Sequence, residues 1–159
     1  MKDNVRTFHV TPTTGWCNDP NGFSRFGEEY HLFYQYYPYE NKWGPMHWGH
    51  CRTKDFIKWE ELPCALAPDM EYDGQGCFSG TAVEHEGKHI LMYTSVLEKD
   101  LEDGTHMVRQ TQSIAIGDGE NYEKVAENPV ITADCCRKEA PRWIFVIRRS
   151  GKKTDASMH

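Results

Sequence analysis

The sequence lacks several features that would assign it to common classes of protein. No apolar run approaches the roughly 20 residues of a membrane-spanning helix, and the N-terminal residues lack the apolar stretch of a secretory signal. Positive charge is scarce, because 18 Lys and Arg stand against 24 Asp and Glu and leave a net charge of -6. Phosphate binding needs a basic surface. We therefore expect a cytoplasmic protein with no nucleic-acid partner and no membrane partner.

The cysteine spacing gives no sign of a metal site. The 6 cysteines, at positions 17, 51, 64, 77, 135 and 136, form no Cys-x-x-Cys pair and no pair at zinc-finger spacing. Without a signal sequence, we expect reduced thiols rather than a disulfide framework. The sequence therefore predicts no metal.

Helical periodicity is missing as well. No segment between residues 1 and 134 shows a sustained 3.6-residue period. Short aromatic-rich segments between turn residues predict β-strands instead. The expected strands are Tyr30–Tyr36, His47–Thr53, Phe56–Trp59, Cys77–Val83, His89–Val96 and Thr111–Ile116. Short strands at regular spacing predict an all-β sandwich, barrel or propeller.

A weak internal repeat fits successive four-stranded blades of a propeller. Gly27 precedes Leu-Phe-Tyr at positions 32–34, and Gly87 precedes Leu-Met-Tyr at positions 91–93. The offset of about 60 residues is somewhat longer than typical propeller repeats. Two copies of one hairpin favour this fold without establishing it.

The sharpest motif is Trp-Cys-Asn-Asp-Pro-Asn-Gly at positions 16–22. Pro20 fixes φ and removes a donor, and Gly22 permits a turn that few residues allow. Such a segment can hold the Asp19 carboxylate at a strand end, oriented by neighbouring amides. The alternative is an ordinary Asx-type turn, because Asn, Asp, Pro and Gly are also common turn residues.

Aromatic and polar residues elsewhere in the sequence favour a carbohydrate pocket. Gln35 interrupts an aromatic strand, and Ser79 follows an aromatic residue. Trp43 and Trp48 lie near a tight turn. Sugars present apolar C–H faces together with many hydroxyl groups, so aromatic platforms beside amides, hydroxyls and carboxylates suit them. Each residue alone is equally compatible with core packing, a strand surface or a turn.

Four motifs in the same order resemble those of glycoside hydrolase family 32, the β-fructofuranosidases (invertases, sucrose-6-phosphate hydrolases and fructan hydrolases). They are the segments at 16–22, 32–36, 43–50 and 78–80. Cys17 stands where the family motif has Met. The resemblance runs from about residue 8 to residue 134, which is most of the chain.

The resemblance implies a five-bladed β-propeller, of which residues 1–134 would form about two N-terminal blades. It implies that Asp19 is the nucleophile of a retaining mechanism that requires no metal or organic cofactor. It also assigns substrate binding to Trp16, Asn18, Gln35, Trp43, Phe78 and Ser79. The implied partner is a small carbohydrate: sucrose, sucrose 6-phosphate or a fructan.

Two further family motifs are missing from the 159 residues. One is Arg-Asp-Pro, whose Asp stabilises the transition state, and the other is Glu-Cys, which supplies the acid/base. Losing a general acid/base costs on the order of 10²–10⁴ in rate. Open strand edges also promote aggregation. We therefore expect this chain alone to have negligible hydrolase activity and to fold poorly.

Residues 135–159 differ in composition, because basic residues crowd this region of an acidic chain. Read one nucleotide out of register, codons for residues 144–151 can spell Phe-Arg-Asp-Pro-Lys-Ile-Trp. We hypothesise that a one-nucleotide deletion near Asp134 shifted the frame, so that residues 135–159 are a non-native tail. The alternative is a genuine short basic tail.

Other functions remain open. The chain could be a non-catalytic sugar-binding β-module, a related five-bladed glycosidase acting on arabinose or xylose chains, or a purely structural β-domain. The segment at 43–50 argues against the arabinose and xylose enzymes, and titration with fructose separates a sugar-binding module from a structural domain.

Overall fold

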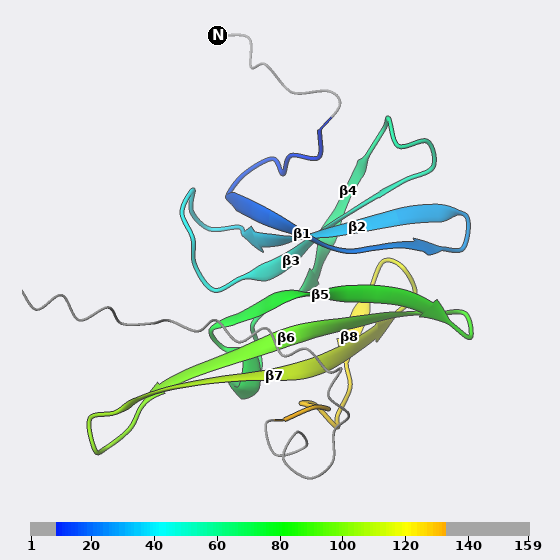
Figure 1. Cartoon of the computed structure of the whole chain (residues 1–159). Coiled ribbons are helices and arrows are strands. Elements are labelled where there is room, and N and C mark those ends of the chain that lie inside the picture. The colour runs from blue at the N-terminus through cyan, green and yellow to red at the C-terminus, as the bar shows by residue number, and fades with distance from the viewer. Residues whose placement is uncertain (1–8, 133–159) are drawn as a thin grey trace, which may run out of the picture.

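The computed structural model describes residues 9–132 and contains two four-stranded antiparallel sheets (Figure 1). Sheet I comprises β1 (Trp16–Phe26), β2 (Glu29–Tyr37), β3 (His47–Thr53) and β4 (Glu60–Leu66). Sheet II comprises β5 (Gly76–His85), β6 (Lys88–Asp100), β7 (His106–Gly117) and β8 (Tyr122–Lys124). A short 3-10 helix, η1 (Glu71–Asp73), lies in the connection between the sheets. The predicted all-β fold is confirmed. The hypothesis about residues 135–159 falls outside the described residues.

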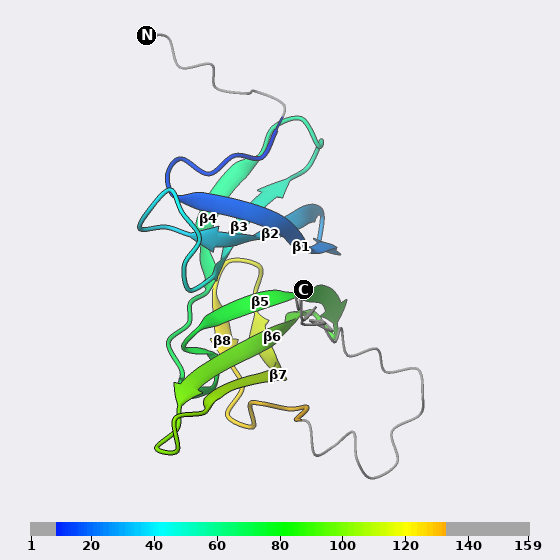
Figure 2. The same cartoon turned by 60° about the vertical axis from the view of Figure 1, so that its left-hand side comes forward.

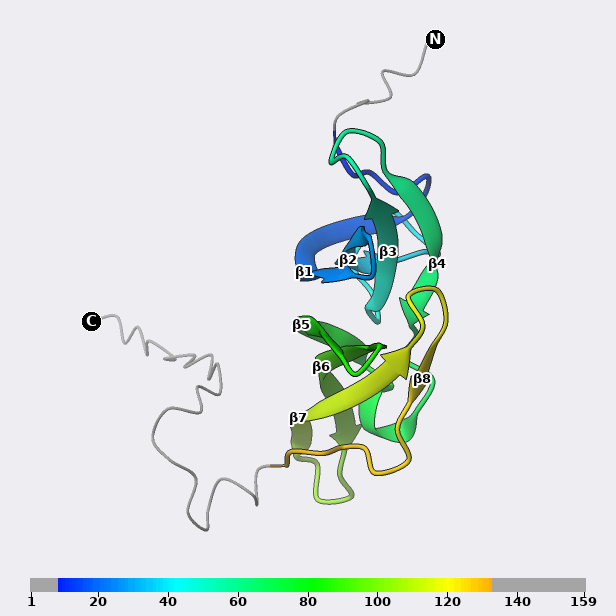
Figure 3. The ribbon, with the colours of Figure 1, turned by 90° about the vertical axis from the view of Figure 1, so that its right-hand side faces the viewer.

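Within each sheet the strands follow one another in chain order, so each sheet is a simple meander. The two sheets lie one above the other (Figure 2). Viewed along the sheets, β1 and β5 lie on one side of the molecule, while β4 and β8 lie on the opposite side (Figure 3). Four-stranded meanders whose first strands share one side are the blades of a β-propeller, with those strands nearest the axis.

The main core lies between the two sheets. Alternate residues of β2 face opposite sides of sheet I, so Phe33 points toward sheet II while Tyr34 and Tyr36 pack on the far face. The buried residues of the core between the sheets are Phe33, Trp48, Ala65, Leu66, Cys77, Leu91, Tyr93 and Ala115. The aromatic residues that predicted these strands therefore hold the two blades together.

Gly22 allows β1 to pass close to its neighbours. It has φ +51, and a Cβ at this position would lie 2.9 Å from the Phe33 ring and 3.1 Å from the Ala82 Cβ. A side chain would therefore push β1 away from β5. The expectation of a turn at Gly22 is wrong, because the whole segment from Trp16 to Phe26 is strand.

The internal repeat corresponds to the first hairpin of each blade. Gly27 and Gly87 lie in the tight turns of the β1–β2 and β5–β6 hairpins, with φ +59 and +73. A left-handed φ favours glycine at both turns. The prediction of successive blades from this repeat is confirmed.

The predicted strand Phe56–Trp59 is wrong, because these residues belong to the loop between β3 and β4. Thr53 Oγ1 accepts a hydrogen bond from the Phe56 N–H, and Asp55 Oδ1 accepts one from the Ile57 N–H. These side-chain acceptors replace the ladder partners that a strand would need. Phe56 adopts φ +60 and its ring lies 4.3 Å from that of Tyr30.

No helix within residues 9–132 has the length and apolar character needed to cross a membrane.

Candidate active site

Asn18 and Asp19 form a β-bulge in β1. Cys17 pairs with Tyr36 and Pro20 pairs with Tyr34, so two residues of β1 stand opposite the single residue Gln35 of β2. Bulges occur next to active sites because they change the direction in which a side chain points. Asn18 and Asp19 are both exposed. The local sequence therefore places the Asp19 carboxylate at a break in the ladder, within the strand rather than at its end.

Trp16 holds the Asn18 side chain in place. The Trp16 indole N–H donates to Asn18 Oδ1 at 2.7 Å. Because this bond uses the amide oxygen, the Asn18 amide nitrogen remains available as a donor beside Asp19. Trp16 is itself 38% exposed, so its ring also offers an apolar face to solvent.

Gln35 is almost fully buried, and it bridges the two sheets. Its Nε2 donates to the carbonyl oxygen of Cys77 at 3.0 Å. The predicted substrate-binding residue thus lies behind the Asn18–Asp19 bulge, with its amide nitrogen engaged by the backbone of β5.

Two of the predicted substrate-binding residues, Trp43 and Phe78, form an aromatic pair. Trp43, in the loop between β2 and β3, is 56% exposed. Its ring meets that of Phe78 edge to face, with centroids 6.3 Å apart. Ser79 follows at a second bulge, because Phe78 pairs with Thr94 and Gly80 pairs with Tyr93. Ser79 is exposed beside the aromatic pair.

The strand pairings bring all of these residues to one end of the two-sheet unit. The start of β1 pairs with the end of β2, and the end of β2 pairs with the start of β3. Met46, just before β3, forms a parallel bridge with Gly76 at the start of β5. Sequence-predicted residues from four separate segments therefore gather at this end. An exposed carboxylate, an amide, a hydroxyl and aromatic faces together suit a sugar ring.

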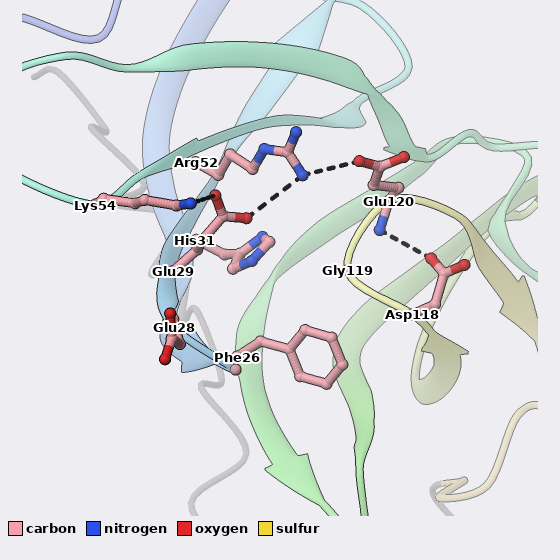
Figure 4. A pocket seen from close by; sticks show the side chains of 10 residues that line it. Phe26, Glu28, Glu29, His31, Arg52, Lys54, Asp118, Gly119 and Glu120 are labelled. Atoms are coloured by element: carbon pink, nitrogen blue, oxygen red, sulfur yellow. Dashed lines mark hydrogen bonds and ion pairs between the residues drawn. The ribbon is translucent and has the colours of Figure 1, made fainter.

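The opposite end holds a cavity of about 440 Å³ between the sheets (Figure 4). Arg52 crosses it, pairing with Glu29 of β2 at 3.4 Å and with Glu120 of the loop between β7 and β8 at 2.8 Å. Lys54 pairs with Glu29 at 3.5 Å. The two cationic side chains that line the cavity, Arg52 and Lys54, are therefore paired with carboxylates. None of the sequence-predicted site residues lines this cavity.

Trp48, which the sequence placed with Trp43 among the aromatic platforms, is instead buried in the core, and Asn21 was not singled out. The buried Trp48 donates its indole N–H to the carbonyl oxygen of Phe78 at 3.1 Å. Asn21 is buried, and its Nδ2 has no hydrogen-bond partner among residues 9–132. Asn21 lies within the recognised motif, so the motif was a signal for it. The Trp48 contact spans 30 residues and has no local signal.

The described residues contain no group of three or more His, Cys, Asp and Glu side chains that could hold a metal ion. Cys17, Cys51, Cys64 and Cys77 are free thiols.

Comparison with known protein families gives one clear match. The model of the glycosyl hydrolases family 32 N-terminal domain matches residues 9–142. The sucrose-6-phosphate hydrolase of Zymomonas mobilis is 44% identical over 164 residues, which cover 96% of this chain and 31% of that protein. The levanase of Bacillus subtilis is 43% identical over 133 residues, covering 78% of this chain and 18% of that protein. The chain therefore spans about a third or less of the length of these relatives.

Solved structures agree with these relatives. The GH32 β-fructofuranosidase of Bombyx mori has a TM-score of 0.71 and 44% identity, covering 79% of this chain and 26% of that chain. A mutant of that protein was solved in complex with sucrose. The sucrose-6-phosphate hydrolase of Lactobacillus gasseri has a TM-score of 0.66 and 39% identity, covering 75% of this chain and 24% of that chain.

Proposed function

The chain belongs to glycoside hydrolase family 32, and from this premise we propose that it carries the nucleophile side of a site that cleaves β-fructofuranosyl bonds. The observation that carries the proposal is the exposed Asn18–Asp19 bulge, which lies at the same end of the two-sheet unit as the Trp43–Phe78 aromatic pair. The substrate class is a fructoside such as sucrose, sucrose 6-phosphate or a fructan. Relatives named for sucrose 6-phosphate hydrolysis and for levan cleavage support this range.

The proposed reaction is a retaining double displacement. An Asp19 carboxylate oxygen attacks the anomeric carbon of the fructosyl unit, and the bond from that carbon to the leaving oxygen breaks. A general acid protonates the leaving oxygen, and the same group then activates the water that releases fructose. Asn18 and Ser79 offer hydrogen bonds to sugar hydroxyls, while Trp16, Trp43 and Phe78 offer apolar faces. Gln35 supports the site through its hydrogen bond to the Cys77 carbonyl.

The 159 residues contain neither the Arg-Asp-Pro nor the Glu-Cys motif that would supply the transition-state carboxylate and the acid/base. We therefore expect the purified chain to hydrolyse sucrose at a negligible rate. Release of glucose and fructose can be followed by coupled assay, with Asp19→Asn as the matched control. Sucrose cleavage that disappears in Asp19→Asn would contradict the expected inactivity, although it would support the role of Asp19.

A substrate that needs no acid isolates the first chemical step. β-Fructofuranosyl fluoride loses fluoride ion without protonation, so attack by Asp19 forms the ester bond as the carbon–fluorine bond breaks. Because no general base is expected in the chain, the fructosyl ester should accumulate. Intact-mass spectrometry and peptide mapping should find one fructosyl unit on Asp19 and none in Asp19→Asn. Fructose binding by calorimetry without any labelling would indicate a non-catalytic sugar-binding module instead.

A further inference from the structure

Two consecutive backbone carbonyls of β5 accept hydrogen bonds from side chains of sheet I. Gln35 Nε2 donates to the Cys77 oxygen at 3.0 Å, and Trp48 Nε1 donates to the Phe78 oxygen at 3.1 Å. Gln35 is 3% exposed and Trp48 is fully buried. Both bonds therefore lie in the interface between the blades, the first buried and the second part-buried.

The second of these bonds depends on the bulge in β5. The Cys77 N–H donates to the Met46 oxygen at 2.8 Å, so Cys77 is turned toward sheet I and away from β6. In a regular strand the next residue would turn its carbonyl toward β6. The register shift between Phe78 and Gly80 breaks this alternation. Trp48 supplies the partner that the Phe78 carbonyl uses at this break.

The Trp48 ring is held firmly enough to fix the direction of its N–H. Its centroid lies 5.6 Å from the centroid of the Phe33 ring and 6.4 Å from that of the Tyr93 ring. Both neighbours are fully buried members of the core between the sheets. The position of the Phe78 carbonyl is thereby tied to the buried core between the sheets.

We propose that Trp48 is a positioning residue for Ser79, acting through its hydrogen bond to the Phe78 carbonyl. The bond fixes the shape of the bulge, and the bulge sets where the Ser79 hydroxyl points. Trp48 itself is buried and does not touch substrate. The functional part of this inference rests on the proposed function, in which Ser79 binds the fructosyl unit.

Trp48→Phe tests the structural part, because it keeps an aromatic ring and removes the N–H. Trp59→Phe is the matched control, since Trp59 packs on the far face of sheet I. In the full chain, hydrogen exchange of the amides at positions 78–81 should be about tenfold faster in Trp48→Phe, because the Phe78 carbonyl loses the hydrogen bond that holds the bulge. It should be unchanged in Trp59→Phe. Equal exchange in wild type and Trp48→Phe would overturn the proposal.

Labelling by β-fructofuranosyl fluoride tests the functional part. Trp48→Phe should raise the half-saturating concentration about tenfold while the final labelled fraction stays the same. A merely unfolded fraction would lower the labelled fraction and leave that concentration unchanged, which would overturn the positioning role. Ser79→Ala should raise the half-saturating concentration in the wild-type background and leave it unchanged in the Trp48→Phe background. An undiminished effect there would also overturn the proposal.

The labelling and the hydrogen-exchange measurements test different claims. If wild type were not labelled at Asp19, the proposed function would fail, and the exchange rates at positions 78–81 would still decide whether Trp48 fixes the bulge.

Discussion

Gln35 and Cys77, which are 42 residues apart, are joined by a hydrogen bond of 3.0 Å that runs from a side chain of sheet I to the backbone of sheet II. Gln35 also stands opposite the Asn18–Asp19 bulge of β1. One residue of β2 therefore stands opposite the bulge in the inner strand of its own blade and bonds the inner strand of the next blade. The geometry of the site thus depends on the interface between the blades as well as on each strand.

Replacement of Gln35 by Leu should destabilise the chain. The Cys77 carbonyl would lose its buried partner, which costs about 1–3 kcal/mol in the free energy of unfolding. Urea denaturation followed by tryptophan fluorescence measures this change. Gln110→Leu is the control, because Gln110 is exposed on β7. This substitution should change the free energy of unfolding by no more than about 0.5 kcal/mol. Equal losses in the two variants would show that the bond between the sheets contributes nothing.

Three buried histidines meet between the sheets. His31 Nδ1 lies 2.9 Å from His50 Nε2, and the rings of His31 and His89 are 5.1 Å apart. The Ser24 hydroxyl donates to the Gly22 carbonyl, so it accepts from the His89 Nε2–H at 2.8 Å. His89 Nδ1 then accepts from the Tyr122 hydroxyl at 2.7 Å. This pattern of donors fits a neutral His89.

Burial lowers the pKa of His50 from 6.5 to about 3 and that of His89 to about 4, and it also lowers the pKa of His31. The folded chain therefore favours neutral rings, and their contribution to stability is complete above pH 6.5. It should be lost as the pH falls from 6.5 toward 4, by up to about 1.4 kcal/mol per pH unit for each histidine.

Urea unfolding at several pH values between 7.5 and 4 measures this loss. His50→Phe should flatten the dependence by about one proton, because the ring stacked on Phe33 is kept and the titrating group is removed. His85→Gln is the control, since His85 is exposed, and it should leave the dependence unchanged. A slope that is the same in His50→Phe as in wild type would contradict the assignment.

Lys124 of β8 neutralises a fully buried carboxylate in the connection between the sheets. Its Nζ lies 2.6 Å from Asp73 Oδ2, which also accepts from the Tyr93 hydroxyl at 2.8 Å. Lys124→Met should lower the free energy of unfolding by about 3–5 kcal/mol, because Asp73 would lose its counter-charge. Lys88→Met, at an exposed position, should change it little. Thermal unfolding of both variants checks this; a Lys124→Met variant as stable as wild type would refute the role of the pair.

Five of the eight strands were predictable because their local signals are strong, whereas β1, β4 and β8 were not among the expected strands. Alternating aromatic residues around Phe33 and the glycine turns at Gly27 and Gly87 correspond to hairpins in the structure. The strand prediction for residues 56–59 was wrong. The aromatic, β-prone composition of this segment does not show that Thr53 and Asp55 accept hydrogen bonds from its backbone and hold it as a loop.

The sequence named the residues that the structure gathers at one end of the two-sheet unit, but it did not predict their arrangement. A motif rich in Asn, Asp, Pro and Gly suits both a turn and a bulged strand, and only pairing with β2 decides between them. The bonds from Gln35 to Cys77 and from Trp48 to Phe78 join residues far apart in the chain. Such contacts depend on how the two blades pack, which no local pattern encodes.

The most direct measurement is the mass of the purified chain after incubation with β-fructofuranosyl fluoride. If the carboxylate in the β1 bulge attacks the sugar, the chain gains one fructosyl unit, the modified peptide contains Asp19, and Asp19→Asn gains none. A fructosyl unit on a different side chain, equal labelling of Asp19→Asn, or no labelling at all would contradict the account.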